Sequence, residues 1–176
     1  MADLAAKAAH ALPEVSAAAV MCSEDKVSEI RVAVWKAWEG DWKQKVATTN
    51  TGQHLRKIRD KVGYWPWSSI KERIMETALA KFRLGHVGLR EHMHRFKRTN
   101  SNLCHCGRVE SIQHFFLQCP LFANSRTILQ SQLHSIGVPV TMKCILGGGE
   151  YPPKIQYEIM QYVSLYLAST GKLMEF

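Results

Sequence analysis

The sequence CHCGRVESIQHFFLQCP runs from Cys104 to Pro120 and contains three of the five cysteines of the chain. Thiolate and imidazole groups are the ligands that zinc prefers, and three cysteines with one histidine form one of its closed tetrahedral sets. Gly107 lets the backbone turn directly after the first cysteine pair. Pro120 ends the short helix that we expect from Ser111 to Gln118, so that a histidine on this helix and a cysteine at its end can converge.

We therefore predict one Zn²⁺ ion, held by Cys104, Cys106, His114 and Cys119. Four protein ligands leave no position for a reactive water, so the zinc would be structural rather than catalytic. His105 lies between two ligands and should point away from the site. The alternative is that these cysteines are buried and pack as small hydrophobic residues. Cys22 and Cys144 have no partner at metal-binding spacing, and we interpret both as structural thiols.

Outside this stretch the pattern is helical, and we predict an all-α helical bundle with a small Cys₃His zinc knuckle. Apolar residues recur every three or four positions in most segments, and no alternating segment is long enough to indicate a sheet. One predicted helix opens with Ser69 and Glu72 as a capping box and buries Ile70, Ile74, Ala78 and Phe82. The other predicted helices begin and end near Asp3 and Ala11, Ser23 and Trp42, His54 and Val62, Leu89 and Phe96, Leu121 and Ile136, and Lys154 and Ser169.

The positive charge is concentrated in one part of the chain. The net charge is +8, but the stretch from Lys43 to Arg98 alone holds 14 basic and 4 acidic residues. Such a block suits a polyanionic partner, because phosphate contacts supply affinity independent of base sequence. The alternative is a solvated basic face without a ligand. The candidate phosphate-binding residues form two clusters, Arg56, Lys57, Arg59 and Lys61, and then Arg83, Arg90, Arg95, Lys97 and Arg98.

The motif order resembles a known family. The elements are Phe82-Arg83-Leu84-Gly85-His86 and Leu89, followed by Cys104-His105-Cys106-Gly107, His114 and Cys119-Pro120. Together they resemble the reverse transcriptase zinc-binding segment of non-LTR (LINE-type) retrotransposon polyproteins, over about a third of the chain. The resemblance implies a zinc-stabilised module that holds RNA, single-stranded DNA or an RNA–DNA intermediate.

The alanine-rich start, Ala2 to Ala9, resembles the last helix of a ribonuclease H domain. In that family an aspartate at the position of Asp3 is the last carboxylate of a two-metal site. Two-metal chemistry needs several carboxylates, and the others are missing from this chain. We therefore expect no enzymatic activity from this chain by itself, and residual cleavage of RNA–DNA hybrids is the least favoured alternative.

These observations predict four regions and a location. Residues 1–20 would be the remnant ribonuclease H helix, 21–68 a basic helical linker region, 69–136 the zinc-knuckle nucleic-acid-binding module, and 137–176 a C-terminal helical extension. We expect a C-terminal fragment of a polyprotein, intracellular in nucleus and cytoplasm, with no membrane span. In the alternative, the chain is a protein-interaction module that packs on other parts of that polyprotein.

Overall fold

The computed structural model describes residues 23–49, 52–59, 61–62 and 72–172, and of these the side chains of Ser23 and Val46 are not described. The predicted helix from Asp3 to Ala11, the proposed role of Asp3, and Cys22 lie outside these ranges. The chain divides into two compact units, Met1–Asp41 and Trp42–Phe176. The division therefore falls inside the range 21–68, which the sequence analysis treats as one region.

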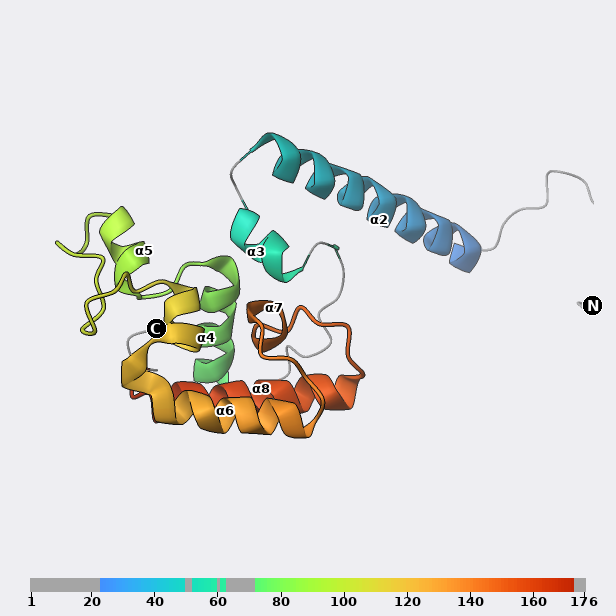
Figure 1. The fold of residues 1–176 in the computed structure, drawn as a ribbon. Helices are drawn as coiled ribbons and strands as arrows, with labels where there is room; N and C mark the ends of the chain where they lie inside the picture. The colour runs from blue at the N-terminus through green and yellow to red at the C-terminus, as the bar shows by residue number, and fades with distance from the viewer. Residues whose placement is uncertain (1–22, 50–51, 60, 63–71, 173–176) are drawn as a thin grey trace, which may run out of the picture. The chain divides into compact units, whose positions relative to one another are not determined.

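The described residues form an all-α fold, which confirms the predicted class (Figure 1). No extended strand occurs among them, and none of their helices combines the length and apolar character needed to cross a bilayer. The helices are α2 (Ser23–Thr48), α3 (Gln53–Ile58), α4 (Arg73–Leu84), α5 (Arg90–Arg95), the π-helix η1 (His114–Gln118), the 3₁₀-helix η2 (Pro120–Phe122), α6 (Ala123–Ser135), α7 (Met142–Ile145) and α8 (Pro153–Ser169).

The described part of the first unit belongs to α2, which continues past Gly40 into the second unit. Glu24 and Asp25 lie in its first turn, where the helix dipole favours acidic groups. Apolar residues recur along one stripe of this helix: Val27, Ile30, Val34 and Trp38 are exposed, with Ile30 at 62%, whereas Trp42 is half-buried. Trp35 and Trp38 stack with their ring centroids 5.3 Å apart.

The second unit is built around one hydrophobic core. Helices α6 and α8 pack against each other along their lengths (Figure 1). Phe82 of α4 and Phe115 and Phe116 of η1 are fully buried and contact one another through their rings, and Tyr166 of α8 completes this cluster. Burial of each such ring contributes roughly 1.5–3 kcal/mol. The predicted zinc-knuckle module, residues 69–136, and the predicted C-terminal extension, residues 137–176, are thus joined by this packing.

Helix α4 departs from the prediction in its start and in its buried face. It begins at Arg73 with Glu72 as the N-cap residue, and no side chain caps it. Ala78 and Phe82 are buried as predicted, but Ile74 is 58% exposed, and Met75 and Leu79 are buried instead. Ser69, predicted for the capping box, and Ile70, predicted for the buried face, lie outside the described residues.

The end of α4 is fixed by a glycine and a distant histidine. Gly85 is in the left-handed region (φ 74°), which a side chain would disfavour. A Cβ at this position would also lie 3.2 Å from Cγ of His54. The Nε2–H of His54 donates to the carbonyl oxygen of Phe82 at 2.8 Å, which satisfies one of the last carbonyls of the helix. Residues on α3 therefore hold the C-terminus of α4.

Candidate metal centre

A short hairpin positions Cys104 and Cys106. Leu103 and Val109 form an isolated antiparallel bridge on either side of these cysteines. The amide of Cys104 donates to the carbonyl of Arg108 at 2.7 Å, and the amide of Gly107 donates to the carbonyl of Cys104 at 2.9 Å. Gly107 has φ 84°, so the turn uses the conformational freedom for which we singled it out.

The π-helix η1 positions His114 and Cys119. The side chain of Ser111 accepts a hydrogen bond from the amide of His114 at 3.0 Å, and the amide of Cys119 donates to the carbonyl of His114 at 2.7 Å. In an α-helix, residues five apart differ in direction by about 140°, because each residue turns by 100°. A π-turn closes its hydrogen bond over five residues instead, so both side chains face the same region.

Tyr166 supplies a hydrogen bond that the backbone lacks. If the π-helical pattern continued, the carbonyl of Phe115 would accept a hydrogen bond from the amide of residue 120. That residue is Pro120, which has no N–H. The Tyr166 hydroxyl donates to this carbonyl at 2.6 Å. Arg126 similarly donates through Nη1 to the carbonyl of Cys119 at 2.7 Å. The ligand-bearing segment is therefore tied to both α6 and α8.

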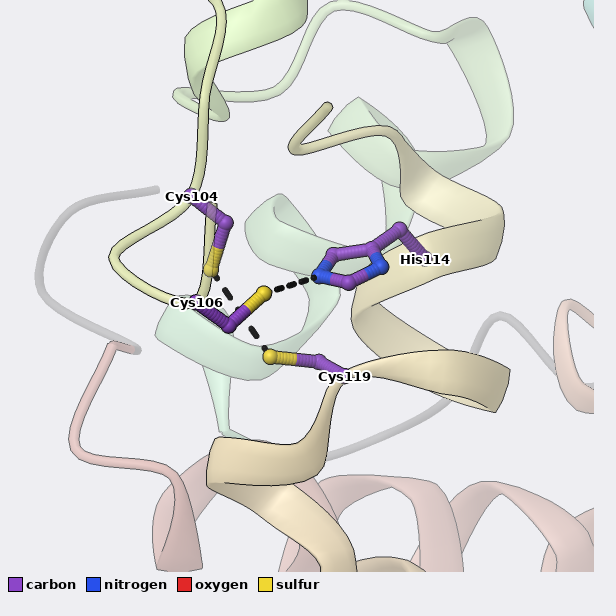
Figure 2. A group of neighbouring side chains, drawn as sticks. All are labelled: Cys104, Cys106, His114 and Cys119. Carbon is purple, nitrogen blue, oxygen red and sulfur yellow. Dashed lines mark hydrogen bonds between the residues drawn. The ribbon is translucent and has the colours of Figure 1, made fainter. Parts of the chain in front are cut away.

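The four side chains converge on a common point (Figure 2). Their ligand atoms all lie within 4.8 Å of one another. The Cys104 and Cys119 sulfurs are 3.7 Å apart, and the Cys106 sulfur is 3.1 Å from Nε2 of His114. Two sulfurs bound to one tetrahedral zinc at about 2.3 Å would be separated by about 3.8 Å, and a disulfide would need about 2.05 Å. The cysteines are therefore free thiols, and the group could hold a metal ion.

Burial and hydrogen bonding shift the pKa values of Cys104, Cys106 and His114. Burial raises the pKa of Cys104 to about 11, so without a cation this sulfur carries its proton at neutral pH. A hydrogen bond from the backbone of Arg108 lowers the pKa of Cys106. Burial, with a smaller contribution from Arg108, lowers the pKa of His114, which favours the neutral imidazole that a metal requires. A bound cation would favour the thiolate form of the cysteines.

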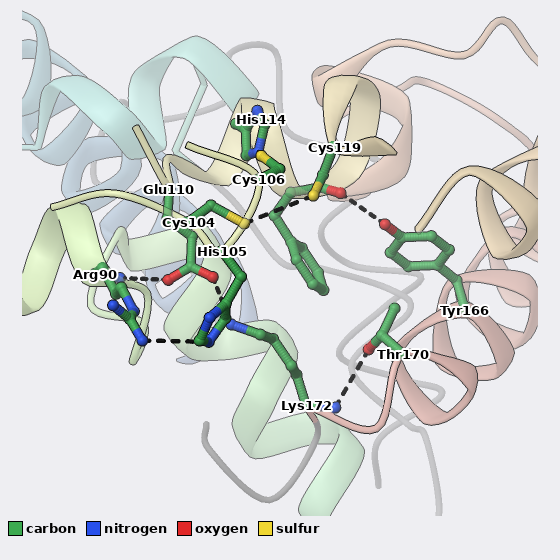
Figure 3. A network of polar contacts seen from close by, with 11 residues as sticks. Arg90, Cys104, His105, Cys106, Glu110, His114, Cys119, Tyr166, Thr170 and Lys172 are labelled. Carbon is green, nitrogen blue, oxygen red and sulfur yellow. Dashed lines mark hydrogen bonds and ion pairs between the residues drawn. The ribbon is translucent and has the colours of Figure 1, made fainter. Parts of the chain in front are cut away.

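A polar network adjoins the cluster on the hairpin side (Figure 3). The Nε2 atom of His105 lies 3.2 Å from Nη2 of Arg90, so its ring points away from the cluster as predicted. Glu110 is 1% exposed; one of its oxygens accepts from the amide of Arg90 at 2.9 Å, and the other pairs with Nζ of Lys172 at 2.5 Å. Glu110, Tyr166 and Lys172 were missed by the sequence analysis, because their partners are 20 or more residues away.

The predicted phosphate-binding residues fall into exposed and engaged groups. Exposed residues are Arg56 and Lys57 on α3, Lys61, Arg95 at the end of α5, Lys97 and Arg98. Lys61 pairs with Glu150 at 3.1 Å, and half-buried Arg59 donates through Nε to the Lys61 carbonyl at 3.2 Å. Arg90 is half-buried beside His105.

The prediction for Arg83 is wrong. Its side chain is 9% exposed, and it donates through Nε to the carbonyl of Leu146 at 3.1 Å and through Nη2 to the sulfur of Met160 at 3.3 Å. Burial lowers its pKa to about 9. Arg83 thus joins α4 to the loop after α7 and to α8, and does not present its charge to an external phosphate.

Comparisons of the whole chain with protein-family models, with curated proteins and with solved structures found no match. The established result at this site is therefore a Cys₃His group that could hold a metal ion, within an all-α fold.

Proposed function

We propose that this chain is a zinc-stabilised nucleic-acid-binding module from the C-terminal part of a non-LTR retrotransposon reverse transcriptase polyprotein. In this proposal Cys104, Cys106, His114 and Cys119 hold one Zn²⁺, and an adjacent basic surface holds RNA, single-stranded DNA or an RNA–DNA intermediate. The chain has no catalytic function of its own, and it acts inside the cell, in the nucleus and cytoplasm.

The convergence of the four ligand atoms within 4.8 Å carries the zinc part of the proposal. The donor set has the thiolate-rich composition of structural zinc sites, and three of its residues, Cys104, His114 and Cys119, are buried. Three thiolates around a divalent cation give a net charge of −1. Arg126, which already contacts the Cys119 carbonyl, brings a compensating positive charge.

The nucleic-acid part rests on the exposed cations next to the zinc hairpin. Arg95, Lys97 and Arg98 end α5 and begin the segment that leads to Cys104, and all three are exposed. Exposed Lys and Arg side chains bind phosphates by releasing condensed counterions. The family assignment rests on the resemblance of the Arg83–His86 and Cys104–Pro120 motifs alone.

Metal analysis of the purified chain tests the zinc site. We expect close to one equivalent of zinc, and we expect Cys106→Ser to abolish it and to destabilise the fold by several kcal/mol, because metal binding is coupled to folding. Cys144→Ser is the matched control, since Cys144 is a buried thiol whose sulfur lies 3.5 Å from the Tyr151 hydroxyl and outside the cluster. A metal-free chain that unfolds cooperatively would refute the zinc assignment.

The salt dependence of binding tests the nucleic-acid interface. The triple variant Arg95→Ala, Lys97→Ala and Arg98→Ala should reduce the log–log salt slope on single strands by about two, at roughly 0.7 per phosphate contact. A control variant replaces three exposed lysines outside both clusters, Lys36, Lys143 and Lys154, by alanine. Equal slopes for the triple variant, the control variant and the wild type would refute this interface.

One observation favours a second candidate, a protein-interaction module. Helix α2 exposes Val27, Ile30 and Val34, each about half or more, along one stripe. Adjacent apolar residues of this kind are typical of helix-docking surfaces. If the basic variants do not alter binding but Ile30→Glu disrupts an association with the polymerase or ribonuclease H part of such a polyprotein, this second function is the correct one.

A further inference from the structure

A cavity of about 610 Å³ lies in the second unit, beside the zinc hairpin and separate from the four ligands. It is bordered by α3, the end of α4, α5, the residues from Ser111 to Gln113, and α7. Sites for small ligands have volumes of about 300–1,000 Å³ and combine apolar walls with a few polar groups. The size of this cavity therefore suits a molecule of several tens of atoms.

The cavity is the place where the two predicted basic clusters meet. Lys57 comes from the first cluster and Arg95 from the second, and both border the cavity although 38 positions separate them. His92 also borders it, and its pKa is lowered first by burial and then by Arg95, His86 and Arg98. The two lining cations, Lys57 and Arg95, favour an anion at that side of the cavity, and the lowered pKa of His92 leaves its imidazole neutral there.

The other walls do not suit a simple anion. Leu84, which is 55% exposed, and the half-buried Ile112 and Met142 provide apolar surface, with the buried Ile58, Val87 and Leu89 behind it. Glu91 contributes a carboxylate, which would repel inorganic phosphate but can accept hydrogen bonds from hydroxyl or amino groups. A ligand that fits all three features carries a phosphate, a flat apolar face and neutral hydrogen-bond donors.

We propose that this cavity receives one nucleotide of a bound single strand. Its phosphate lies between Lys57 and Arg95, its base packs against the apolar wall, and its sugar or base donates hydrogen bonds to Glu91. His54 gives this wall a fixed shape, because its ring is held by the Phe82 carbonyl and packs over Gly85. The inference rests on the proposed function and deepens it, since it states where a strand enters the fold.

Two variants of the full chain test the cavity. Leu84→Trp places a large side chain at a lining position that is 55% exposed, and Ile128→Trp, at a 60% exposed position on α6 that does not line the cavity, is its control. Lys57→Gln with Arg95→Gln removes the two cations, and its control is Arg73→Gln with Lys154→Gln, both exposed and outside the lining. Unfolding curves confirm that each variant is folded.

Two measurements keep the inference distinct from the proposed function. The first is the affinity for a single-stranded oligonucleotide. The second is the change in the imidazole NMR signals of His54 and His92 on addition of adenosine or uridine 5′-monophosphate, with inorganic phosphate as the comparison probe. We expect both cavity variants to lower oligonucleotide affinity at least tenfold relative to their controls, and mononucleotides to shift both imidazole signals more than phosphate does.

Each outcome decides one of the two proposals. If the oligonucleotide binds wild type and cavity variants equally and mononucleotides leave the imidazole signals unchanged, the cavity assignment is wrong while nucleic-acid binding stands. If mononucleotides shift the signals but no oligonucleotide binds, the cavity assignment holds and the proposed function fails. If inorganic phosphate reproduces the mononucleotide shifts in full, the cavity binds anions only and the inference is overturned.

Discussion

Lys97 adopts a left-handed backbone conformation with φ 56° directly after α5. Its amide donates to the carbonyl of His94, and the amide of Arg98 donates to the carbonyl of Met93, each at 2.9 Å. This pair of bonds defines a Schellman motif, in which glycine normally occupies the left-handed position. Lysine pays a steric penalty there because its Cβ approaches the backbone. The local strain lies within the proposed nucleic-acid surface, to which Lys97 belongs.

We predict that Lys97→Gly raises the free energy of unfolding by about 0.5–1 kcal/mol, because glycine removes that penalty. Lys97→Ala removes the charge but keeps the Cβ, so it should give no such gain. Urea denaturation of both variants measures the difference. Equal stabilities for the glycine and alanine variants would show that the conformation carries no strain.

Some residues were assigned correctly because their chemistry is local. Gly107 was predicted to allow a turn and Pro120 to end a helix, and both residues do so in the structure. Arg83 was assigned wrongly because its charge suggested a phosphate ligand, whereas its environment comes from Leu146 and Met160, more than 60 positions away. A single sequence gives no signal for such distant carbonyl and thioether partners.

At the scale of elements, the π-helix η1 depends on a hydroxyl from another helix. Tyr166 of α8 donates to the Phe115 carbonyl, beside the residue that carries the candidate ligand imidazole. Burial also raises the pKa of Tyr166, so the hydroxyl keeps its proton at neutral pH.

We predict that Tyr166→Phe lowers the free energy of unfolding by about 1–3 kcal/mol, because a buried carbonyl loses its donor. Tyr157→Phe, on the exposed side of the same helix, is the control and should change stability by less than about 0.5 kcal/mol. Chemical denaturation checks the stability, and metal titration checks whether the affinity falls with it. A Tyr166→Phe chain as stable as the control would show that η1 needs no such donor.

The helices that could be predicted most accurately are those whose ends are marked by clear boundary residues. Helix α8 was predicted from Lys154 and begins at Pro153, because two prolines and a regular apolar period define it. In α4 the burial of Ala78 and Phe82 was predicted correctly, but Ile74 was predicted to be buried where the structure buries Met75. The reason is that both Ile74 and Met75 are apolar, and only packing against the core selects between them.

At the scale of the whole molecule, one buried ion pair joins the hairpin from Leu103 to Val109 to the chain beyond α8. Glu110 follows the hairpin directly, and Lys172 lies three residues after the end of that helix. Their side chains are 2% and 14% exposed. Removing one member of such a pair leaves a buried charge without its counterion.

We predict that Lys172→Ala lowers the free energy of unfolding by about 3 kcal/mol. The double variant Glu110→Gln with Lys172→Ala should lose less, because no unpaired carboxylate remains. Lys154→Ala, an exposed lysine at the start of α8, is the control. Thermal and urea unfolding of the wild type, the single variants Glu110→Gln and Lys172→Ala, and the double variant give the coupling between the two sites. A double variant less stable than Lys172→Ala alone would contradict this account.

The π-turn between His114 and Cys119 also has a consequence for insertions and deletions. The two residues are five positions apart in the sequence. In a plain α-helix, residues four positions apart point in directions about 40° apart, whereas residues six positions apart point about 120° apart. Deleting the exposed Gln118 should therefore keep metal binding and convert η1 to an α-turn. Inserting one alanine after Gln118 should abolish metal binding. Metal analysis of the two length variants distinguishes the cases, and equal metal content in both would contradict the argument. If the two variants differ in metal content as expected, the site tolerates shortening of the chain at this point but not lengthening.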